Sequence, residues 1–497
     1  MKAFLLYRDR DFDRKQKLPW HEQALIQDLE LSVLFNAMAL GDEFLLEVAR
    51  KVALSSLSNV DNILYRQDIL KDCLENSSLI REIYALALEA IQREKQGYWS
   101  IFSKYPQAIL SRSLEVLEMF VSMLKKLRNI ADIHADKFRS EGFITFFAML
   151  QRELTDDYFA IIQGHLRELR FRDGVLMSAQ LGKGNKGINF VLRKWGKKPG
   201  WLERILGDGA TTYTFHIADR DESGSRALTE LKDRGIDQVA NALAQSADHI
   251  LSFFHMLRTE LAFYIGCLNL HEQLIQMNEP VSFPVPVAPG QYRHSFKGLY
   301  DVSLALTVKK TVVGNDVNAD NKHLFIVTGA NQGGKSTFLR SVGLSQLMMQ
   351  CGMFVAAEEF SANVCNGLFT HYKREEDVTL QSGKLDEELG RMSEIVDHIT
   401  PNSMLLFNES FAATNEREGS EIARQIVQAL LDRGLKIFFV THMYEFAHGF
   451  YRQGKEDAIF LRAERQDDGL RTFKLIEGEP LQTSYGEDLY YRIFATQ

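Results

Sequence analysis

The residues best suited to chemistry in this chain form a glycine-rich loop between an apolar strand and an apolar helix. The strand pattern Leu324–Thr328 runs directly into Gly329–Thr337, which fits the phosphate-binding pattern G-x-x-x-x-G-K-[ST]. Glycines allow the backbone N–H groups to converge on phosphates at a helix N-terminus. Lys335 supplies positive charge and Ser336 offers a hydroxyl to Mg²⁺. The pattern predicts an ATP and Mg²⁺ site with contacts from Gly329, Ala330, Asn331, Gln332, Gly333, Gly334, Lys335, Ser336 and Thr337.

Two further strand patterns end in polar residues. Met404–Phe407 is followed by Asn408 and Glu409. ATPases with this loop place an acidic residue at the first position to hold a magnesium-bound water, and ABC-like ones place a glutamate at the second to polarise the attacking water. We therefore assign Glu409 as the catalytic base and Asn408 to Mg²⁺ through water. Because Asn408 brings no negative charge, we expect weaker metal binding and slow hydrolysis.

A third strand pattern, Ile437–Thr441, presents His442. Its position after the third strand suits a residue that senses or stabilises the γ-phosphate, although a lone histidine after a strand is often structural. We assign His442 as the second catalytic residue.

A basic segment interrupts the otherwise acidic chain. Residues 164–205 hold ten basic residues against three acidic ones, whereas the whole chain has a net charge of −8. Such an excess, interleaved with Trp195 and Trp201, could contact the phosphates of DNA, but a solvated basic loop is an equally good interpretation. The candidate DNA-contacting residues are Lys183, Lys186, Arg193, Lys194, Lys197 and Lys198.

The elements that must position these residues change in kind along the chain. Helical periodicity dominates to about residue 168, glycine-rich β-prone pieces follow, a second helical stretch ends at Pro280, and strands alternate with helices from Tyr300. We predict a multidomain protein with an all-α core and lever helices, a small β-rich insertion and an α/β P-loop ATPase domain. The expected segments are 1–105 (helical core), 106–168 (outgoing lever), 169–222 (clamp-like insertion), 223–279 (returning lever), 280–299 (linker) and 300–497 (ATPase).

Composition limits the alternatives. The chain of 497 residues is 45% hydrophobic and 25% charged, as in ordinary globular proteins, and its net charge excludes a uniformly basic nucleic-acid binder. No run of apolar residues is long enough for a membrane span. The four cysteines are widely spaced, which fits neither a disulfide framework nor a zinc site. We expect a cytoplasmic protein that does not enter a membrane.

The phosphate loop resembles that of the MutS mismatch-repair family, including its asparagine and paired glycines. The segment Asn408–Gly419 is similar to the family's Asp-Glu segment without gaps, and Thr441–His442 matches its Thr-His. Val313–Asp316 resembles the turn that faces the adenine, which implies that Asn315 contacts the nucleotide. Ser484–Gly486 resembles a Ser-Tyr-Gly near the end of the family's ATPase domain, and Arg66–Gln67 an Arg-Gln of its helical core.

The resemblance implies a homodimer of ATPase domains in which a partner loop, expected at Ser382–Glu388, completes each site. This chain departs from the family there, at Asn408, and at Val312, where an aromatic ring often stands. The family's mismatch-reading and connector domains have no counterpart before the helical core. The resemblance therefore describes a shortened relative in which mismatch recognition is not expected.

Three functions remain open. The first is an ATP-dependent clamp on duplex or branched DNA in repair or recombination, with other repair or recombination proteins as partners. The second is an ATP-operated switch that binds a protein partner. The third, a small-molecule kinase, needs an acceptor pocket and a lid that the sequence does not indicate.

Overall fold

The computed structural model describes residues 1–96, 105–172, 174–194, 213–374, 383–465 and 471–482. The chain forms two compact units, which are described separately. The first unit comprises residues 1–3, 81–138 and 144–258. The second comprises residues 4–80, 139–143 and 259–497. The fold thus mixes helices and sheets, as the sequence predicts.

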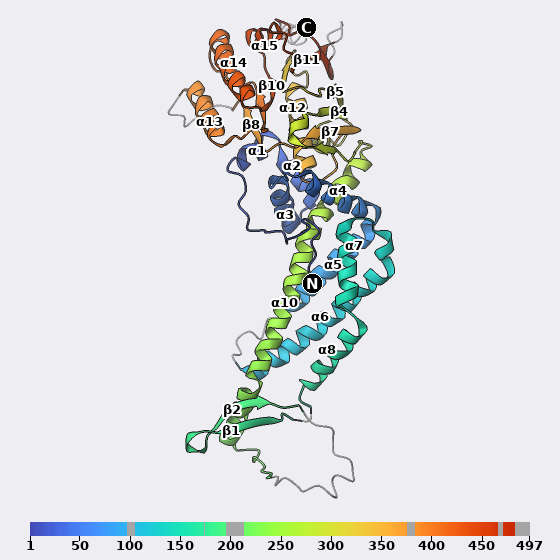
Figure 1. The fold of residues 1–497 in the computed structure, drawn as a ribbon, viewed down its shortest axis with the longest axis vertical. Coiled ribbons are helices and arrows are strands. Elements are labelled where there is room, and N and C mark those ends of the chain that lie inside the picture. Colours follow the sequence, from blue (N-terminus) through green and yellow to red (C-terminus); the bar gives the residue numbers. More distant parts are fainter. Residues whose placement is uncertain (97–104, 173, 195–212, 375–382, 466–470, 483–497) are drawn as a thin grey trace, which may run out of the picture. The chain divides into compact units, whose positions relative to one another are not determined.

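The first unit is built mainly from long helices (Figure 1). Phe120 of α6 stacks on Phe254 of α10 with ring centroids 5.8 Å apart, so apolar residues spaced by three and four form one buried seam. Pro106 opens α6, where its missing N–H costs no helical hydrogen bond. The helices of the first unit are α5 (Ser77–Gln96), α6 (Pro106–His134), α7 (Glu141–Glu153), α8 (Asp156–Glu168) and the greater part of α10 (Glu222–Gln276).

A short hairpin follows α8. Strands β1 (Met177–Leu181) and β2 (Gly187–Leu192) pair antiparallel through a turn that contains Gly184 at φ 72°. The hairpin is the strand-bearing part of the insertion expected at residues 169–222, and residues 195–212 of that insertion lie outside the described residues.

The second unit begins with an extended segment followed by α1 (Glu22–Asp28), α2 (Leu31–Ala39), α3 (Glu43–Leu54) and α4 (Val60–Glu75). The buried carboxylate of Glu260, on α10, accepts hydrogen bonds from the backbone N–H groups of Leu5 (2.5 Å) and Phe12 (3.3 Å). The fully buried Arg66 donates to the carbonyl oxygens of Leu6 (2.8 Å) and Cys351 (3.4 Å). These contacts attach the extended segment to the helices of the same unit.

A six-stranded sheet forms the centre of the second unit, with the strand order β12-β11-β6-β10-β9-β8. All neighbours are parallel except β11 and β12. Parallel strands carry their carboxyl ends to one edge, so loops after β6, β9 and β10 meet there. The strands are β6 (Leu324–Thr328), β8 (Leu368–Tyr372), β9 (Met404–Asn408), β10 (Lys436–Val440), β11 (Ala458–Arg465) and β12 (Arg471–Glu477).

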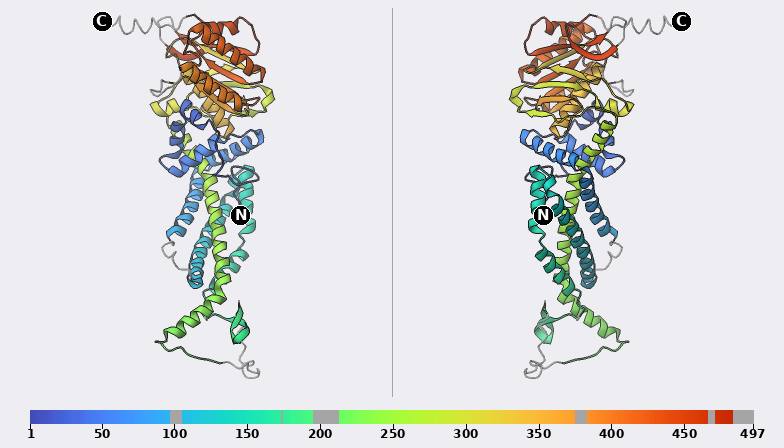
Figure 2. Two further views of the ribbon diagram at one scale, coloured as in Figure 1. Left: turned by 90° about the vertical axis from the view of Figure 1, so that its left-hand side faces the viewer. Right: turned by 90° about the vertical axis from the view of Figure 1, so that its right-hand side faces the viewer.

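Helices cover both faces of this sheet (Figures 1 and 2). Alternate strand residues such as Leu405, Phe407 and Phe439 pack against α13 (Lys384–His398), α14 (Glu416–Asp432) and α15 (Tyr444–Tyr451). On the other face lies α12 (Lys335–Gln350), where Gly343 allows Leu29 and Leu406 to approach. The strands are therefore buried on both sides, which explains their continuous apolar sequences.

A smaller sheet of order β3-β7-β4-β5 contains the segment we expected to be a linker. β3 (Val285–Val287) and β4 (His294–Leu299) both pair with β7 (Glu359–Asn363), and β4 also pairs with β5 (Asn315–Asn318). Residues 280–299 are thus not the simple linker that we expect from the sequence, because they include β3 and β4 of this sheet. β3 is an edge strand, where Pro286 is tolerated because an edge has one side without a ladder partner. A short helix, α11 (Val302–Val308), follows β4.

All four cysteines are buried, and none forms a disulfide. Burial raises the pKa of the Cys351 and Cys365 thiols to about 12. Burial likewise raises the pKa of the Cys73 and Cys267 thiols well above the usual range. In the described part of the chain, no helix combines the length and apolar character that a membrane span requires.

Candidate functional site: a nucleotide cavity at the sheet edge

The phosphate loop lies between β6 and α12, as the sequence predicts. Gly329 has φ 113°, and Gly334 has φ 87° as the residue before α12, so both occupy backbone conformations that favour glycine. A Cβ atom at Gly329 would lie 2.8 Å from the backbone nitrogen of Ala463. The loop therefore needs glycine for its conformation and for its close approach to β11.

Lys335 is folded back onto the loop. Its Nζ donates to the carbonyl oxygens of Gly329 (3.0 Å) and Ala330 (2.9 Å). Burial lowers the pKa of Lys335 to about 8, an effect that the nearby Glu409 carboxylate opposes. Phosphate oxygens offer this amine stronger partners than carbonyl oxygens, because they are charged.

Ser336 and Asn408 meet across the sheet edge. The Ser336 hydroxyl donates to the Asn408 side-chain carbonyl oxygen at 3.0 Å. A hydroxyl and an amide oxygen are both hard ligands of the kind that Mg²⁺ accepts, directly or through water. Their proximity fits the magnesium site predicted from the sequence, although the pair carries no negative charge.

Glu409 and His442 also lie together. His442 Nε2 is 2.7 Å from Glu409 Oε1, and Glu409 lies just beyond β9 with φ 54°. The hydrogen bond from His442 is the main cause of the lowered pKa of Glu409, and burial opposes it. Glu409 is therefore ionised at neutral pH and available to accept a proton.

A cavity of about 460 Å³ extends from the phosphate loop. Its lining includes Asn331–Phe338 of the phosphate loop and the start of α12, together with Glu409. The lining also includes the mostly apolar side chains of Leu299, Tyr300, Leu304, Val308, Val312, Val313 and Phe473. A cavity that combines phosphate ligands with apolar and aromatic side chains has the chemistry that a nucleotide requires.

Phe473 is a wall residue that the sequence did not reveal. It lies in β12 with φ 58°, is 49% exposed, and lies beside Gly334. The sequence does not reveal the order of the strands in the sheet. Phe473 reaches the phosphate loop because β12 pairs with β11. Asn315 lines the same cavity, but its side chain accepts from Leu475 N–H at 2.7 Å and donates to the Phe473 carbonyl oxygen at 3.4 Å.

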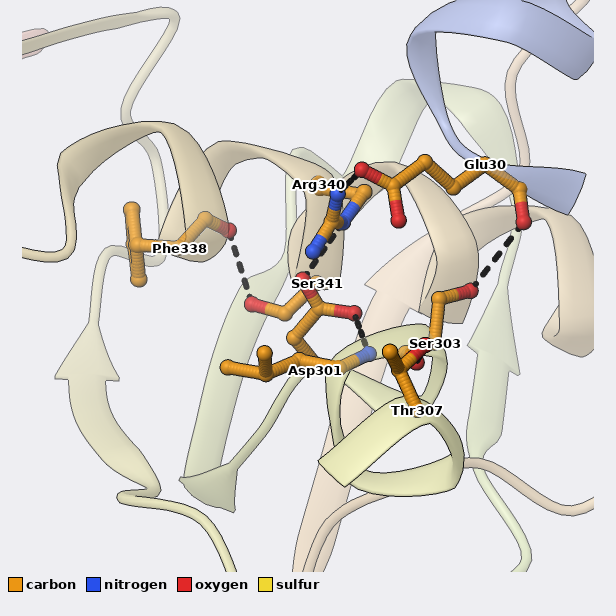
Figure 3. Close-up of polar contacts among 8 residues, drawn as sticks. Glu30, Asp301, Ser303, Thr307, Phe338, Arg340 and Ser341 are labelled. Atoms are coloured by element: carbon orange, nitrogen blue, oxygen red, sulfur yellow. Dashed lines mark hydrogen bonds and ion pairs between the residues drawn. The ribbon is translucent and has the colours of Figure 1, made fainter. Parts of the chain in front are cut away.

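Arg340, on α12, joins the cavity wall to α2 (Figure 3). Its guanidinium donates to the buried Asp301 carboxylate at 2.5 Å and also contacts Glu30. Asp301 lines the cavity and caps α11 through Leu304 N–H at 3.0 Å. Burial raises the pKa of Asp301, while the charge of Arg340 opposes the rise. The start of α11 is thus fixed to the phosphate-loop helix.

The candidate DNA-contacting residues lie in the first unit, apart from Lys197 and Lys198, which lie outside the described residues. Lys194 pairs with Glu168 at 2.8 Å, and Arg193 donates to the Ser178 hydroxyl at 2.9 Å. Lys183 and Lys186 are exposed near the hairpin turn. These two lysines are the better candidates for contacts with phosphates.

The segment Ser382–Glu388, which we expect to reach a partner subunit, includes the start of α13. Lys384–Glu388 lie in the first turns of α13, and the Glu388 carboxylate accepts from Phe411 N–H at 2.9 Å within the same chain. Ser382 lies outside the described residues, as do Ser484–Gly486.

Comparison with known proteins finds two regions of the chain that match family models. A family model described as the MutS2 N-terminal domain matches residues 58–277, and one described as MutS domain V matches residues 325–490. The chain is 27% identical to DNA mismatch repair protein MutS of Streptococcus mutans over 319 residues, which cover 60% of this chain and 37% of that protein.

Two further relatives match shorter stretches. Identity to DNA mismatch repair protein MutS of Thermotoga petrophila is 33% over 177 residues, covering 35% of this chain and 22% of that protein. Identity to MutS protein homolog 4 of Mus musculus is 27% over 253 residues, covering 46% and 26%. The matched part thus spans well under half the length of these relatives. Both family models and these relatives carry the MutS name, so the chain is similar to MutS proteins over residues 58–277 and 325–490.

Proposed function

We propose that this protein binds and hydrolyses ATP and uses the reaction to control its contact with DNA. The observation that carries the proposal is one cavity lined by the phosphate loop, Ser336 and Glu409. Ser336 is hydrogen-bonded to Asn408, and Glu409 is hydrogen-bonded to His442. Family relatives named for DNA mismatch repair support the DNA part. The non-mismatch role and the homodimer of ATPase domains are likewise proposals from the resemblance.

In the proposed reaction, Glu409 accepts a hydrogen bond and then a proton from the attacking water. The water oxygen forms a bond to the γ-phosphorus, and the bond from that phosphorus to the bridging oxygen breaks, which gives ADP and phosphate. His442 holds the Glu409 carboxylate in its ionised form. Lys335 moves from carbonyl oxygens to the phosphates and neutralises part of their charge.

Magnesium would be held by the Ser336 hydroxyl and, through water, by the Asn408 amide oxygen. When bound, it supplies charge neutralisation on the phosphate oxygens. Since neither ligand is anionic, we propose that the metal is held weakly and that turnover is slow.

DNA contact is proposed for the hairpin of the first unit. Lys183 and Lys186 are exposed there, and contacts to phosphates are strong in low salt and insensitive to base sequence. The second candidate, a nucleotide-operated switch for a protein partner, is favoured by the apolar residues of the same hairpin. Leu181 is 80% exposed and Val191 47% exposed, and such side chains suit a protein interface.

The test uses the full chain with MgATP. Lys335→Ala should abolish productive ATP binding, and Glu409→Gln should retain binding but lower kcat by at least about a hundredfold. Unchanged turnover in Glu409→Gln would refute its role as the base. Gel shifts with linear, mismatched and branched duplexes, with and without ATP, separate the two candidates, because a switch for a protein partner would show no nucleotide-dependent DNA binding.

A further inference from the structure

A turn formed by residues 311–315 contributes to the lining of the nucleotide cavity. Val312 and Val313 of this turn line the cavity together with Leu304 and Val308. A nucleotide with its phosphates on Gly329–Thr337 must place its base in the remaining space. The apolar walls there suit the flat faces of a base. The turn is therefore available to contact a base in this space.

Two hydrogen bonds hold this turn to the residues that directly follow α10. The Val312 N–H donates to Glu279 Oε1 at 2.7 Å, and the Thr311 hydroxyl donates to the Met277 carbonyl oxygen at 3.3 Å. Helix α10 ends at Gln276, and the chain turns at Asn278, which has φ 57°. The turn is thus hydrogen-bonded to the residues that directly follow the end of α10.

Glu279 is an unusual residue for such a contact. Glu279 is 2% exposed, and within the described part of the chain no cation pairs with its carboxylate. Burial raises its pKa, and the hydrogen bond from Val312 opposes that rise. A buried carboxylate without a cation costs stability, which an apolar residue at the same position would avoid. The cost suggests that this side chain has a task other than stabilising the fold.

We propose that Glu279 is a positioning residue that holds the turn 311–315 against the base of a bound nucleotide and connects the base end of the cavity to α10. This proposal rests on the proposed nucleotide binding and assigns different roles to the phosphate loop and to the turn 311–315. The phosphate loop supplies affinity for the triphosphate, and the turn reports that a base is attached. Inorganic tripolyphosphate would fill the loop end and leave the end of α10 unchanged.

The experiment compares ATP with inorganic tripolyphosphate on the full chain, with magnesium present. Glu279→Ala should weaken ATP binding about tenfold and leave tripolyphosphate binding within about twofold, because one charge-assisted hydrogen bond to the turn is lost. Glu279→Gln keeps an acceptor oxygen and should restore most of the ATP affinity. Gln276→Ala, at an exposed position on the last turn of α10, is the matched control.

Hydrogen exchange of residues 268–279 provides the second measurement. ATP should change exchange there in the wild type, and tripolyphosphate should not; in Glu279→Ala the effect of ATP should disappear. Equal weakening of both ligands, or weakening of neither, would overturn the proposal. Should Glu279→Ala not fold, Glu279→Asp shortens the side chain by one methylene and permits the same comparison. Failure of the wild type to bind either ligand would instead reject the proposed function.

Discussion

At the scale of single residues, the site is prepared for phosphates by contacts that a ligand can replace. Lys335 rests on two backbone carbonyl oxygens, and Ser336 rests on the side chain of Asn408. Glu409 is already ionised and oriented by His442. The proposed nucleotide binding would therefore exchange these neutral partners for charged phosphate oxygens.

The lowered pKa of Lys335 predicts that nucleotide binding takes up a proton in alkaline solution. Free Lys335 titrates at about 8, whereas bound phosphates favour its charged form, so ATP affinity should fall by about tenfold per pH unit well above that value. Calorimetry in buffers of different ionisation enthalpy would measure the uptake. Lys335→Arg, which stays charged, should show no uptake; uptake equal to that of the wild type would assign the proton to another group.

Asn408→Asp should raise turnover. An added carboxylate beside Ser336 strengthens the metal site, and we expect an increase in kcat of about tenfold, equivalent to about 1.4 kcal/mol in the barrier. Steady-state phosphate release at saturating magnesium is the measurement. Asn408→Ala, which removes the oxygen, should lower the rate. A lower rate in Asn408→Asp would show that the natural amide is needed for another reason.

At the scale of elements, patterns along the chain predict much of the site. β6, β9 and β10 are continuous apolar runs because they are buried on both faces, and the polar residue after each run lies at one edge because the strands are parallel. The sequence could not show Phe473, whose place depends on β12 pairing with β11. Nor could it show that 280–299 contains strands, since its prolines are typical of a loop.

The attachment of the N-terminal segment to α10 predicts a pH effect. Burial raises the pKa of Glu260 to about 7, so the protonated carboxyl is favoured in the folded state. The contribution of the protonated Glu260 to the free energy of unfolding is complete below the pKa of the unfolded state, near 4.5. It is lost as the pH rises through about 7, which lowers the free energy of unfolding by about 3 kcal/mol. Hydrogen exchange of the backbone amides of residues 4–12, corrected for intrinsic exchange rates, should show that this segment detaches more often at the higher pH.

Glu260→Gln removes the titrating group and should flatten this dependence. Glu272→Gln changes an exposed glutamate on the same helix and should leave it as in the wild type. An unchanged pH dependence in Glu260→Gln would assign the effect to other groups.

At the scale of the whole molecule, the net charge is −8, so the proposed DNA binding requires a local group of basic residues. Lys183→Glu with Lys186→Glu should weaken DNA binding similarly for all base sequences and reduce the slope of log K against log salt by about 2. Fluorescence anisotropy across salt concentrations is the measurement. Arg433→Glu with Arg452→Glu makes the same change in net charge at exposed positions of the second unit. An equal effect of both pairs would exclude the hairpin as the contact.

Because all four native cysteines are buried, the protein is suited to labelling at an introduced cysteine. Thiolates, and not thiols, react with maleimides, and these four groups are both shielded and held protonated. A single cysteine introduced on the surface should therefore take a fluorophore selectively in the otherwise natural sequence. Reaction at the native positions would in turn serve as an internal sensor of unfolding.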